Sequence, residues 1–274
     1  MKIKIPNVGL GGGLVTDGNT REKQYEIYDY AIKSGLVHLI DTSSAYGDNE
    51  QVLGEALNNN PEGTNVYIMT KVSNIGQRDG DIRRALERSL RLLGRDYIEI
   101  YLIHWPQQGT FLNTWSQMER LYEEGLVHSI GVCNFEIHHL RELMSCANIM
   151  PQINEFENHP LMTQDALINY CRAFDIIPIS YSPIARMHDV LIKSQPVYEC
   201  AKKYEKTPAQ VILAWHKQLG HIAIPRTTNI NHFKELFDVS EEFELDYKDV
   251  CWISSLNNNT RLRYDPDWAD FSRL

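Results

Sequence analysis

The sequence has no long apolar run, no cysteine pairs and no excess of positive charge, and each absence excludes a class of protein. Nowhere do eighteen apolar residues follow one another, and no apolar stretch follows the first lysines, so neither a membrane span nor a secretory signal is expected. The five cysteines form no Cys-x-x-Cys pair, which argues against a disulfide framework and a zinc site. We therefore expect a cytoplasmic protein with reduced thiols and no bound metal.

The charge and composition of the chain narrow its partners and its domain organisation. The formal net charge is -9 at pH 7, which makes nucleic acid and anionic membrane surfaces poor partners. The 274 residues are 43% hydrophobic, enough for one full core, and no linker rich in Ser, Gly or Pro divides them. We expect one domain, residues 1–274, that acts on a small molecule as a monomer or weak dimer.

Short apolar runs and amphipathic stretches alternate along the chain. The short runs are typical of buried strands, and apolar residues at three-to-four spacing are typical of helices packed on them. Strands are predicted at residues 2–5, 37–41, 66–71, 97–104, 129–133, 152–154, 176–181 and 222–224. Helices are predicted at residues 21–33, 49–57, 82–93, 114–124, 137–147, 163–174, 196–204 and 208–219. This alternation predicts an α/β fold, a (β/α)8 TIM barrel with a short N-terminal β segment, an extra C-terminal helix at 246–256 and an irregular tail.

The glycine cluster from Gly9 to Gly13 has two interpretations. It could be a phosphate-binding loop, but a Rossmann loop leads straight into a helix, and this cluster leads into Leu-Val-Thr-Asp-Gly. It could instead be a tight strand end beside a pocket, where glycine allows close approach of the backbone. We favour the strand end and retain the phosphate-binding loop as the alternative.

Three consecutive predicted strands end on polar residues, namely Asp41, Lys71 and His104, and Tyr46 follows five residues after Asp41. In a parallel barrel the carboxyl ends of the strands share one rim, where catalytic groups collect. Each residue alone has an ordinary interpretation, such as a turn aspartate, a solvent-facing lysine or a buried core histidine. Together they predict a site, because four such groups on one rim are hard to attribute to chance.

These four side chains suit proton delivery to a carbonyl. Tyrosine is a weak acid, but the ammonium of Lys71 would lower the pKa of Tyr46, and a carboxylate at Asp41 would hold that ammonium in place. His104 can donate a hydrogen bond to the oxygen that Tyr46 protonates. Such a site delivers a proton while another group delivers hydride.

Seven motifs in order give the sequence a family resemblance. They are DTSSAYGDNE (41–50), TKV (70–72), LIHWP (102–106), GVCNF (131–135), NEFENHP (154–160), SYSP (180–183) and IPRT (224–227). Together they resemble the aldo-keto reductases. The resemblance implies a barrel that binds NADPH, with NADH as an alternative, across its carboxyl face and reduces an aldehyde or ketone to the alcohol. It implies that Tyr46 is the general acid, that Lys71 and Asp41 tune it, and that His104 orients the carbonyl.

The same resemblance implies a set of cofactor and substrate residues. Asn134, with Cys133 and Glu155, would hold the nicotinamide carboxamide, and Tyr181 would stack on its ring. The pyrophosphate would lie along Ser182, Pro183, Ile184 and Ala185; the adenosine end would contact Ile224, Arg226, Thr227, Thr228, Asn229 and His232; and the substrate pocket would include Gly13 and Trp105.

The sequence departs from the usual family pattern at four of these positions. Cys133 replaces a serine, and Glu155 replaces a glutamine. An ionised Glu155 would favour the positively charged oxidised ring over the reduced one. Gly13 stands where a pocket tryptophan is frequent, so an open wall is expected there. His232 replaces an arginine, so a real but modest preference for NADPH over NADH is expected.

Two other functions are compatible with these residues. An isomerase or aldolase would use Lys71 as a Schiff-base amine, but that role needs a lysine of lowered pKa, and a neighbouring Asp41 acts in the opposite direction. A non-catalytic NADPH-binding, redox-sensing module of the same fold is the second alternative. The sequence does not identify the substrate, because its pocket would be shaped by loops at residues 14–20, 105–112 and 186–195 and by the tail after 257.

Overall fold

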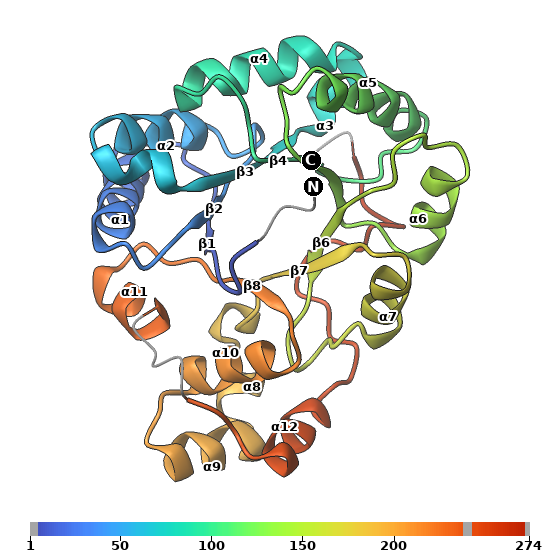
Figure 1. Ribbon diagram of the computed structural model, residues 1–274. Coiled ribbons are helices and arrows are strands. Elements are labelled where there is room, and N and C mark those ends of the chain that lie inside the picture. Colours follow the sequence, from blue (N-terminus) through green and yellow to red (C-terminus); the bar gives the residue numbers. More distant parts are fainter. Residues whose placement is uncertain (1–4, 238–242, 272–274) are drawn as a thin grey trace.

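Eight parallel strands form a barrel in the computed structural model, which describes residues 5–237 and 243–271 (Figure 1). Neighbouring strands follow the order of the chain, from β1 to β8. The barrel closes where the Gly9 amide donates to the Ala223 carbonyl and the Gly11 amide donates to the Pro225 carbonyl, each at 2.9 Å. The strands are β1 (Leu10–Gly11), β2 (Leu39–Asp41), β3 (Tyr67–Val72), β4 (Ile100–Ile103), β5 (Ile130–Cys133), β6 (Ile153–Glu157), β7 (Ile177–Tyr181) and β8 (Ile222–Ile224).

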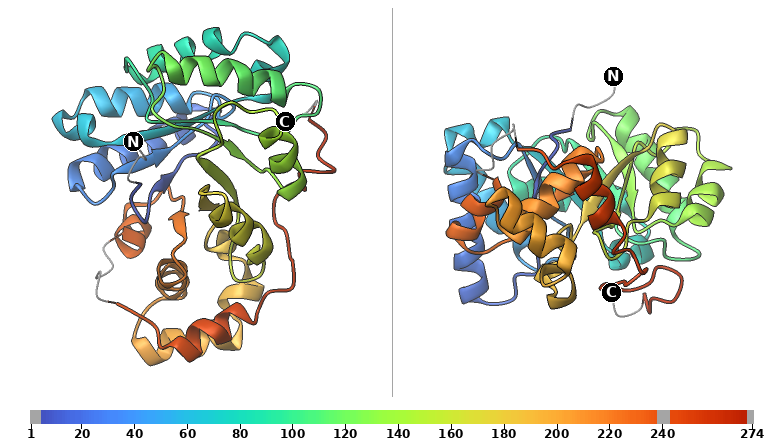
Figure 2. Two further views of the ribbon diagram at one scale, coloured as in Figure 1. Left: turned by 45° about the vertical axis from the view of Figure 1, so that its right-hand side comes forward. Right: turned by 90° about the horizontal axis from the view of Figure 1, so that it is seen from below.

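Helices surround this barrel, and the fold is the predicted (β/α)8 TIM barrel (Figures 1 and 2). They are α1 (Gly18–Ser34), α2 (Asn49–Asn58), α3 (Asn74–Asp79), α4 (Ile82–Leu93), α5 (Phe111–Glu123), α6 (Ile137–Met144), α7 (Asp165–Ala173), α8 (Asp189–Ile192), α9 (Gln195–Tyr204), α10 (Pro208–Gln218), α11 (Ile230–Phe237) and α12 (Tyr247–Ser254), with short 3₁₀ helices at Pro61–Asn65 and Ala185–Met187. None of the helices in the described ranges is both long and apolar enough to cross a membrane. The extra C-terminal helix is α12, which packs with α9 and α10.

Local capping accounts for the predicted helix at 82–93, which is confirmed residue for residue. The Asp81 side chain accepts a hydrogen bond from the Arg84 amide at 3.0 Å, which satisfies a free donor of the first turn. At the other end Gly94 adopts the left-handed conformation that closes a helix. Helix α10 starts as predicted, with Thr207 in a capping box and Pro208 in the first turn.

The first barrel strand lies later in the chain than the strand predicted at residues 2–5. Residues 2–4 of the predicted strand lie outside the described residues, and the first barrel strand is Leu10–Gly11, inside the glycine cluster. A side chain at Gly11 would put its Cβ 2.8 Å from the Ile224 carbonyl oxygen, so glycine lets β1 approach β8. Because Gly11 to Gly13 also line a cavity, the cluster is a strand end beside a pocket.

The alternation of apolar residues also misplaced other boundaries. Strand β6 extends to Glu157, although Asn154, Glu155 and Glu157 are polar, because all three side chains are buried with hydrogen-bond or ion-pair partners. Strand β4 is shorter than predicted, since Tyr97 is exposed and stacks on His128. Helices α3, α8 and α11, which are four to eight residues long, were missed.

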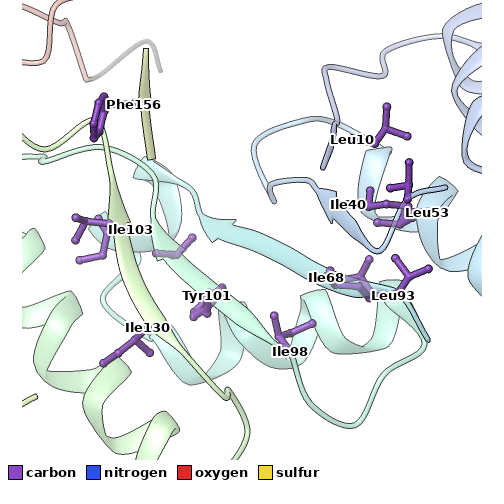
Figure 3. Packing of buried hydrophobic residues seen from close by; sticks show 14 of the residues in the cluster. Leu10, Ile40, Leu53, Ile68, Leu93, Ile98, Tyr101, Ile103, Ile130 and Phe156 are labelled. Atoms are coloured by element: carbon purple, nitrogen blue, oxygen red, sulfur yellow. The ribbon is translucent and has the colours of Figure 1, made fainter. Parts of the chain in front are cut away.

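Apolar side chains fill two regions of the barrel. Outside, Leu10, Ile40 and Ile68 on the strands pack against Leu53 and Leu93 of the helices (Figure 3). Inside the barrel lies a second cluster, made of Leu39, Met69, Ile100, Leu102, Cys133, Ile153, Ile179 and Ile224. These two layers hold the strand ends rigidly, so the side chains on the rim are placed by the packed core.

Candidate active site

A cavity of about 680 Å³ opens at the carboxyl ends of the strands. Most of the residues proposed from the sequence line it. These are Gly13, Asp41, Tyr46, His104, Trp105, Cys133, Asn134, Glu155, Tyr181, Ser182, Pro183, Ile184, Ile224 and Arg226. Lys71 lies behind this lining and is fully buried.

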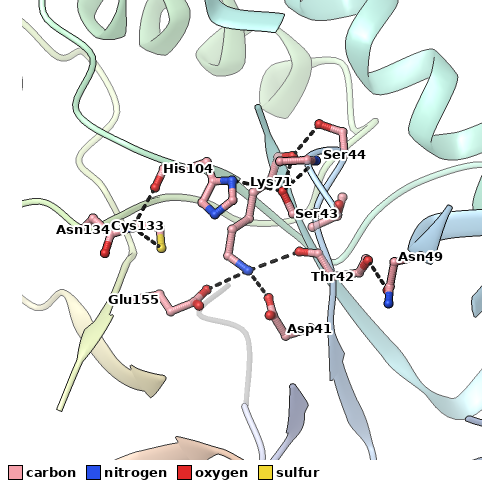
Figure 4. A network of polar contacts seen from close by, with 12 residues as sticks. Asp41, Thr42, Ser43, Ser44, Asn49, Lys71, His104, Cys133, Asn134 and Glu155 are labelled. Carbon is pink, nitrogen blue, oxygen red and sulfur yellow. Dashed lines mark hydrogen bonds and ion pairs between the residues drawn. The ribbon is translucent and has the colours of Figure 1, made fainter. Parts of the chain in front are cut away.

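Lys71 is the centre of a buried charge network (Figure 4). Its ammonium pairs with the Asp41 carboxylate, lies 3.1 Å from Glu155 Oε2 and donates to the Thr42 carbonyl at 3.1 Å. Burial alone would lower the pKa of Lys71, but the charges of Asp41 and Glu155 raise it well above its usual value. Lys71 is therefore a permanent cation beneath the cavity floor.

Tyr46 is half-buried, and the Lys71 ammonium lies 5.6 Å from the centre of its ring. The sequence predicted that Lys71 would lower the pKa of Tyr46, and the net direction of that prediction is wrong. Burial raises the pKa of Tyr46 above its usual value, and the lowering effect of Lys71 does not offset it. Tyr46 therefore keeps its proton at neutral pH, as an acid that donates to a substrate must.

His104 faces Tyr46 across the cavity, with ring centres 5.6 Å apart. Its Nδ1 contacts the Ser43 hydroxyl at 3.1 Å, a partner that the sequence did not suggest. Burial, followed by the charges of Lys71 and Arg263, lowers the pKa of His104 well below its usual value. A neutral ring whose Nδ1 accepts from Ser43 carries its proton on Nε2, which leaves that atom free to donate to a carbonyl oxygen.

The Glu155 carboxyl faces Lys71, although the family resemblance assigned Glu155 to binding the nicotinamide carboxamide. Burial and then the charge of Asp41 raise the pKa of Glu155 to about 8, and Lys71 acts in the opposite direction. Glu155 therefore keeps its proton to a higher pH than an exposed glutamate does. The predicted preference of an ionised Glu155 for the oxidised ring is accordingly restricted to pH values above about 8.

Glu155→Gln should change how stability depends on pH. The pKa of this carboxyl is about 8 in the folded chain and near 4.5 when unfolded, so the native state holds the extra proton between these values. This group should then make the wild-type free energy of unfolding fall as pH rises through this window, by roughly 1 kcal/mol for each pH unit. Chemical denaturation of both proteins from pH 5 to 8 measures this slope. The curve of the variant should fall less steeply than that of the wild type, because Asp41, whose pKa is also raised by burial, remains in the variant. Parallel curves would contradict the assignment.

Asn134 connects three of the proposed cofactor residues. It adopts a left-handed conformation with φ 65, its Nδ2 donates to the His104 carbonyl at 2.9 Å, and its Oδ1 accepts from the Tyr181 hydroxyl at 2.6 Å. Nδ2 also lies 3.2 Å from Cys133 Sγ. These bonds fix the Tyr181 ring at the cavity wall. A carboxamide bound to Asn134 would share or replace them.

The loop after β7 is conformationally strained. Ser182, Ala185, Arg186 and Met187 all have positive φ, between 46 and 56. Non-glycine residues adopt this conformation at a cost, and such residues cluster at ligand sites. Ser182, Pro183 and Ile184 line the cavity, while Ala185 is fully buried beneath it.

The proposed adenosine residues divide into two groups. Arg226 lines the cavity, but Thr227, Thr228, Asn229 and His232 do not. Asn229 precedes α11, and its Oδ1 accepts hydrogen bonds from the amides of Asn231 and His232 at 2.8 and 3.3 Å, so it acts as a helix cap. His232 is exposed in the first turn of α11.

The wall at Gly13 is not open, contrary to the expectation from the sequence. The Arg226 guanidinium lies against this residue, so that a Cβ at Gly13 would fall 2.3 Å from its Cζ. The missing side chain at Gly13 therefore makes room for a cation from the end of β8.

Sequence reasoning missed seven residues that line the cavity. They are Gly11, Gly12, Leu14, Ala45, Arg186, Met187 and Arg263. Leu14, Arg186, Met187 and Arg263 fall within the loops and tail expected to shape the pocket. Irregular segments have no periodicity, so the sequence located the segments and not the individual side chains.

Known proteins resemble this chain over nearly its whole length. A model described as the Aldo/keto reductase family matches residues 7–258. The chain belongs to the aldo/keto reductase family. This aldo/keto reductase is 38% identical over 268 residues to the 9,11-endoperoxide prostaglandin H2 reductase of Trypanosoma cruzi (strain CL Brener), covering 97% of this chain and 92% of the relative.

Two further relatives agree with this membership. The glyoxal reductase of Bacillus subtilis (strain 168) is 35% identical, with 97% of this chain and 94% of the relative covered. The crystal structure of the Bombyx mori aldo-keto reductase AKR2E4 in complex with NADP has a TM-score of 0.87 and 30% identity, covering 97% of this chain and 94% of that one. The chain is an NAD(P)H-dependent oxidoreductase of this family.

Proposed function

We propose that this enzyme reduces an aldehyde or ketone to the alcohol with NADPH. The observation that carries the proposal is the convergence of Tyr46, His104 and the network of Lys71 on one cavity. The cavity also suits a dinucleotide phosphate, because Arg186 and Arg226 line it beside the strained loop after β7. NADPH would supply the hydride.

Each residue of the site would then have a separate role in the reaction. The substrate oxygen would lie between the Tyr46 hydroxyl and His104 Nε2, which both donate hydrogen bonds to it. As negative charge develops on that oxygen, Tyr46 transfers its proton, and the fixed charge of Lys71 stabilises the phenolate that remains. Asp41 and Glu155 hold the ammonium in place, and Ser43 holds the His104 ring. Reprotonation of Tyr46 from water completes the cycle.

The geometry argues against the alternative Schiff-base function. A nucleophilic lysine needs a lowered pKa and access to the substrate. The pKa of Lys71 is raised, and the side chain is fully buried behind the cavity lining. A direct test adds NADPH and a panel of small aldehydes to the purified protein. Loss of NADPH absorbance that depends on the aldehyde supports the proposal, while NADPH binding without turnover would favour the redox-sensing module.

Arg226→Ala should nearly erase the preference for NADPH over NADH. The guanidinium is the proposed partner of the ribose phosphate, and a lost charge-assisted hydrogen bond is worth about 10-fold or more in affinity. His232→Arg should widen the preference, because it adds a permanent cation in the first turn of α11. The ratio of kcat/KM for the two cofactors measures both effects.

A matched control for these variants is Lys248→Gln, which removes a cation from the exposed surface of α12. It should leave the cofactor ratio unchanged. An undiminished preference for NADPH in the Arg226 variant would mean that other residues bind the phosphate.

A further inference from the structure

The C-terminal tail supplies one wall of the cavity. It leaves α12 and runs past α7 and α6 toward the end of the chain (Figures 1 and 2). Tyr264 and Phe271 of the tail pack around Trp105, with ring centres 6.5 and 6.2 Å away. Within this segment, Arg263 lines the cavity together with Tyr46, His104 and Trp105.

The backbone at Arg263 is anchored to the barrel. The Glu157 carboxylate at the end of β6 is fully buried and accepts hydrogen bonds from the amides of Leu262 at 2.7 Å and Arg263 at 3.0 Å. Burial opposes ionisation of Glu157, but the hydrogen bonds from His159 and these amides hold its pKa below the usual value. A buried, ionised carboxylate therefore holds the Arg263 backbone at a defined position.

The charge of Arg263 has no counterion in the described part of the chain. The neighbouring Arg261 pairs with Glu136 at 2.8 Å, whereas no ion pair involves Arg263 among residues 5–237 and 243–271. The side chain is exposed, and its charge reaches His104, whose pKa it helps to lower after burial and Lys71. An unpaired cation on a fixed backbone next to a catalytic group suits recognition of an anion.

The other two arginines of the cavity would bind the cofactor under the proposed function. Arg186 follows β7 and Arg226 follows β8, where the phosphates of the cofactor would lie. Arg263 comes instead from the tail that packs on Trp105, on the proposed substrate side. Arg261, the neighbouring cation of the tail, is already paired with Glu136 and Asp265, so Arg263 offers one guanidinium without an ion pair among the described residues. One such guanidinium matches a monoanion that accepts two parallel hydrogen bonds, which is a carboxylate.

We propose that Arg263 binds the carboxylate of the substrate, and that the preferred substrates are aldehydes or ketones that carry a carboxylate group. This inference rests on the proposed carbonyl reduction and names its substrate class. The positive charge acts on substrate binding, so it should appear mainly in KM. It also favours entry of an anion into a protein whose formal net charge is -9.

The test compares pairs of aldehydes that differ in charge and little else. Succinic semialdehyde and its methyl ester form one pair, and para-carboxybenzaldehyde and its methyl ester form another. At saturating NADPH, the wild-type kcat/KM should favour the acid over the ester by about 10-fold, equivalent to about 1.4 kcal/mol. Arg263→Gln should bring the ratio close to one, and Arg263→Lys should keep part of it because the charge remains.

Two controls separate substrate binding by Arg263 from a general effect of lost charge and from cofactor binding. Arg91→Gln removes an exposed arginine of α4 far along the chain from the tail, and its acid-to-ester ratio should match the wild type. The Kd of NADPH, from fluorescence titration, should be the same for wild type and Arg263→Gln. An equal loss of NADPH affinity would overturn the inference, because Arg263 would then bind the cofactor.

The outcomes also distinguish failure of the inference from failure of the proposed function. Reduction of both esters with an acid-to-ester ratio of one or less in the wild type would overturn the role of Arg263 and leave carbonyl reduction intact. Absence of turnover for all four aldehydes and for uncharged aldehydes would overturn carbonyl reduction, and the inference with it. A ratio that falls in Arg263→Gln and partly returns in Arg263→Lys supports the proposal.

Discussion

Tyr46→Phe should lower kcat for carbonyl reduction by about 10²- to 10⁴-fold, the range expected when a positioned general acid is lost. The phenyl ring keeps the shape of the cavity and removes only the proton donor, so the Kd of NADPH should stay the same. Burial holds the pKa of Tyr46 above its usual value. Ionisation of Tyr46 should therefore contribute little to the pH dependence of the wild-type reduction rate near neutral pH. Stopped-flow measurement of hydride transfer tests the step directly.

A matched control is Tyr198→Phe, which removes the same hydroxyl from an exposed tyrosine of α9. It should retain wild-type turnover and stability. Turnover by Tyr46→Phe at the rate of this control would end the mechanism, since proton delivery would then come from another group or from water.

Lys71→Met should reduce both stability and activity. Removing one partner of a buried ion pair leaves the other charge uncompensated, which typically costs about 3–5 kcal/mol. Here Asp41 would lose its counterion, and Glu155 would lose its neighbouring cation. The phenolate left after proton transfer would also lose its nearest positive charge, so kcat should fall by about the factor expected for the loss of the acid. Denaturant titration and steady-state kinetics measure the two effects.

The double variant Asp41→Asn/Lys71→Met separates stability from catalysis. With the buried carboxylate also neutralised, much of the lost free energy of unfolding should return, while kcat should stay low. A single Lys71→Met variant with wild-type stability and wild-type kcat would show that the ion pair has neither role.

Much of the barrel and its rim followed from local patterns in the sequence. Helix 82–93 could be predicted to the residue because Asp81 and Gly94 are local start and stop signals whose hydrogen bonds involve neighbours in the chain. The rim residues Asp41 and His104 could be predicted because parallel strands of a barrel end on one face. Tyr46 was placed on the rim because it follows Asp41 by five residues, whereas the cofactor residues depended on the resemblance between ordered motifs.

Other features were decided by contacts between distant segments. The side chain of Glu155 is directed to Lys71, and its raised pKa depends on burial beside Asp41, which comes from a strand far away in the sequence. Arg226, which follows the last barrel strand, fills the wall of the cavity at Gly13.

The division between sequence and tertiary structure therefore has a physical basis. Periodicity and capping act between residues within a few positions of one another, so the sequence alone determined the order of strands and helices and the placement of Asp41, Lys71 and His104 on one rim. Desolvation and charge act through space, so only the tertiary structure decided that Tyr46 keeps its proton and that Arg263 from the tail lines the same cavity.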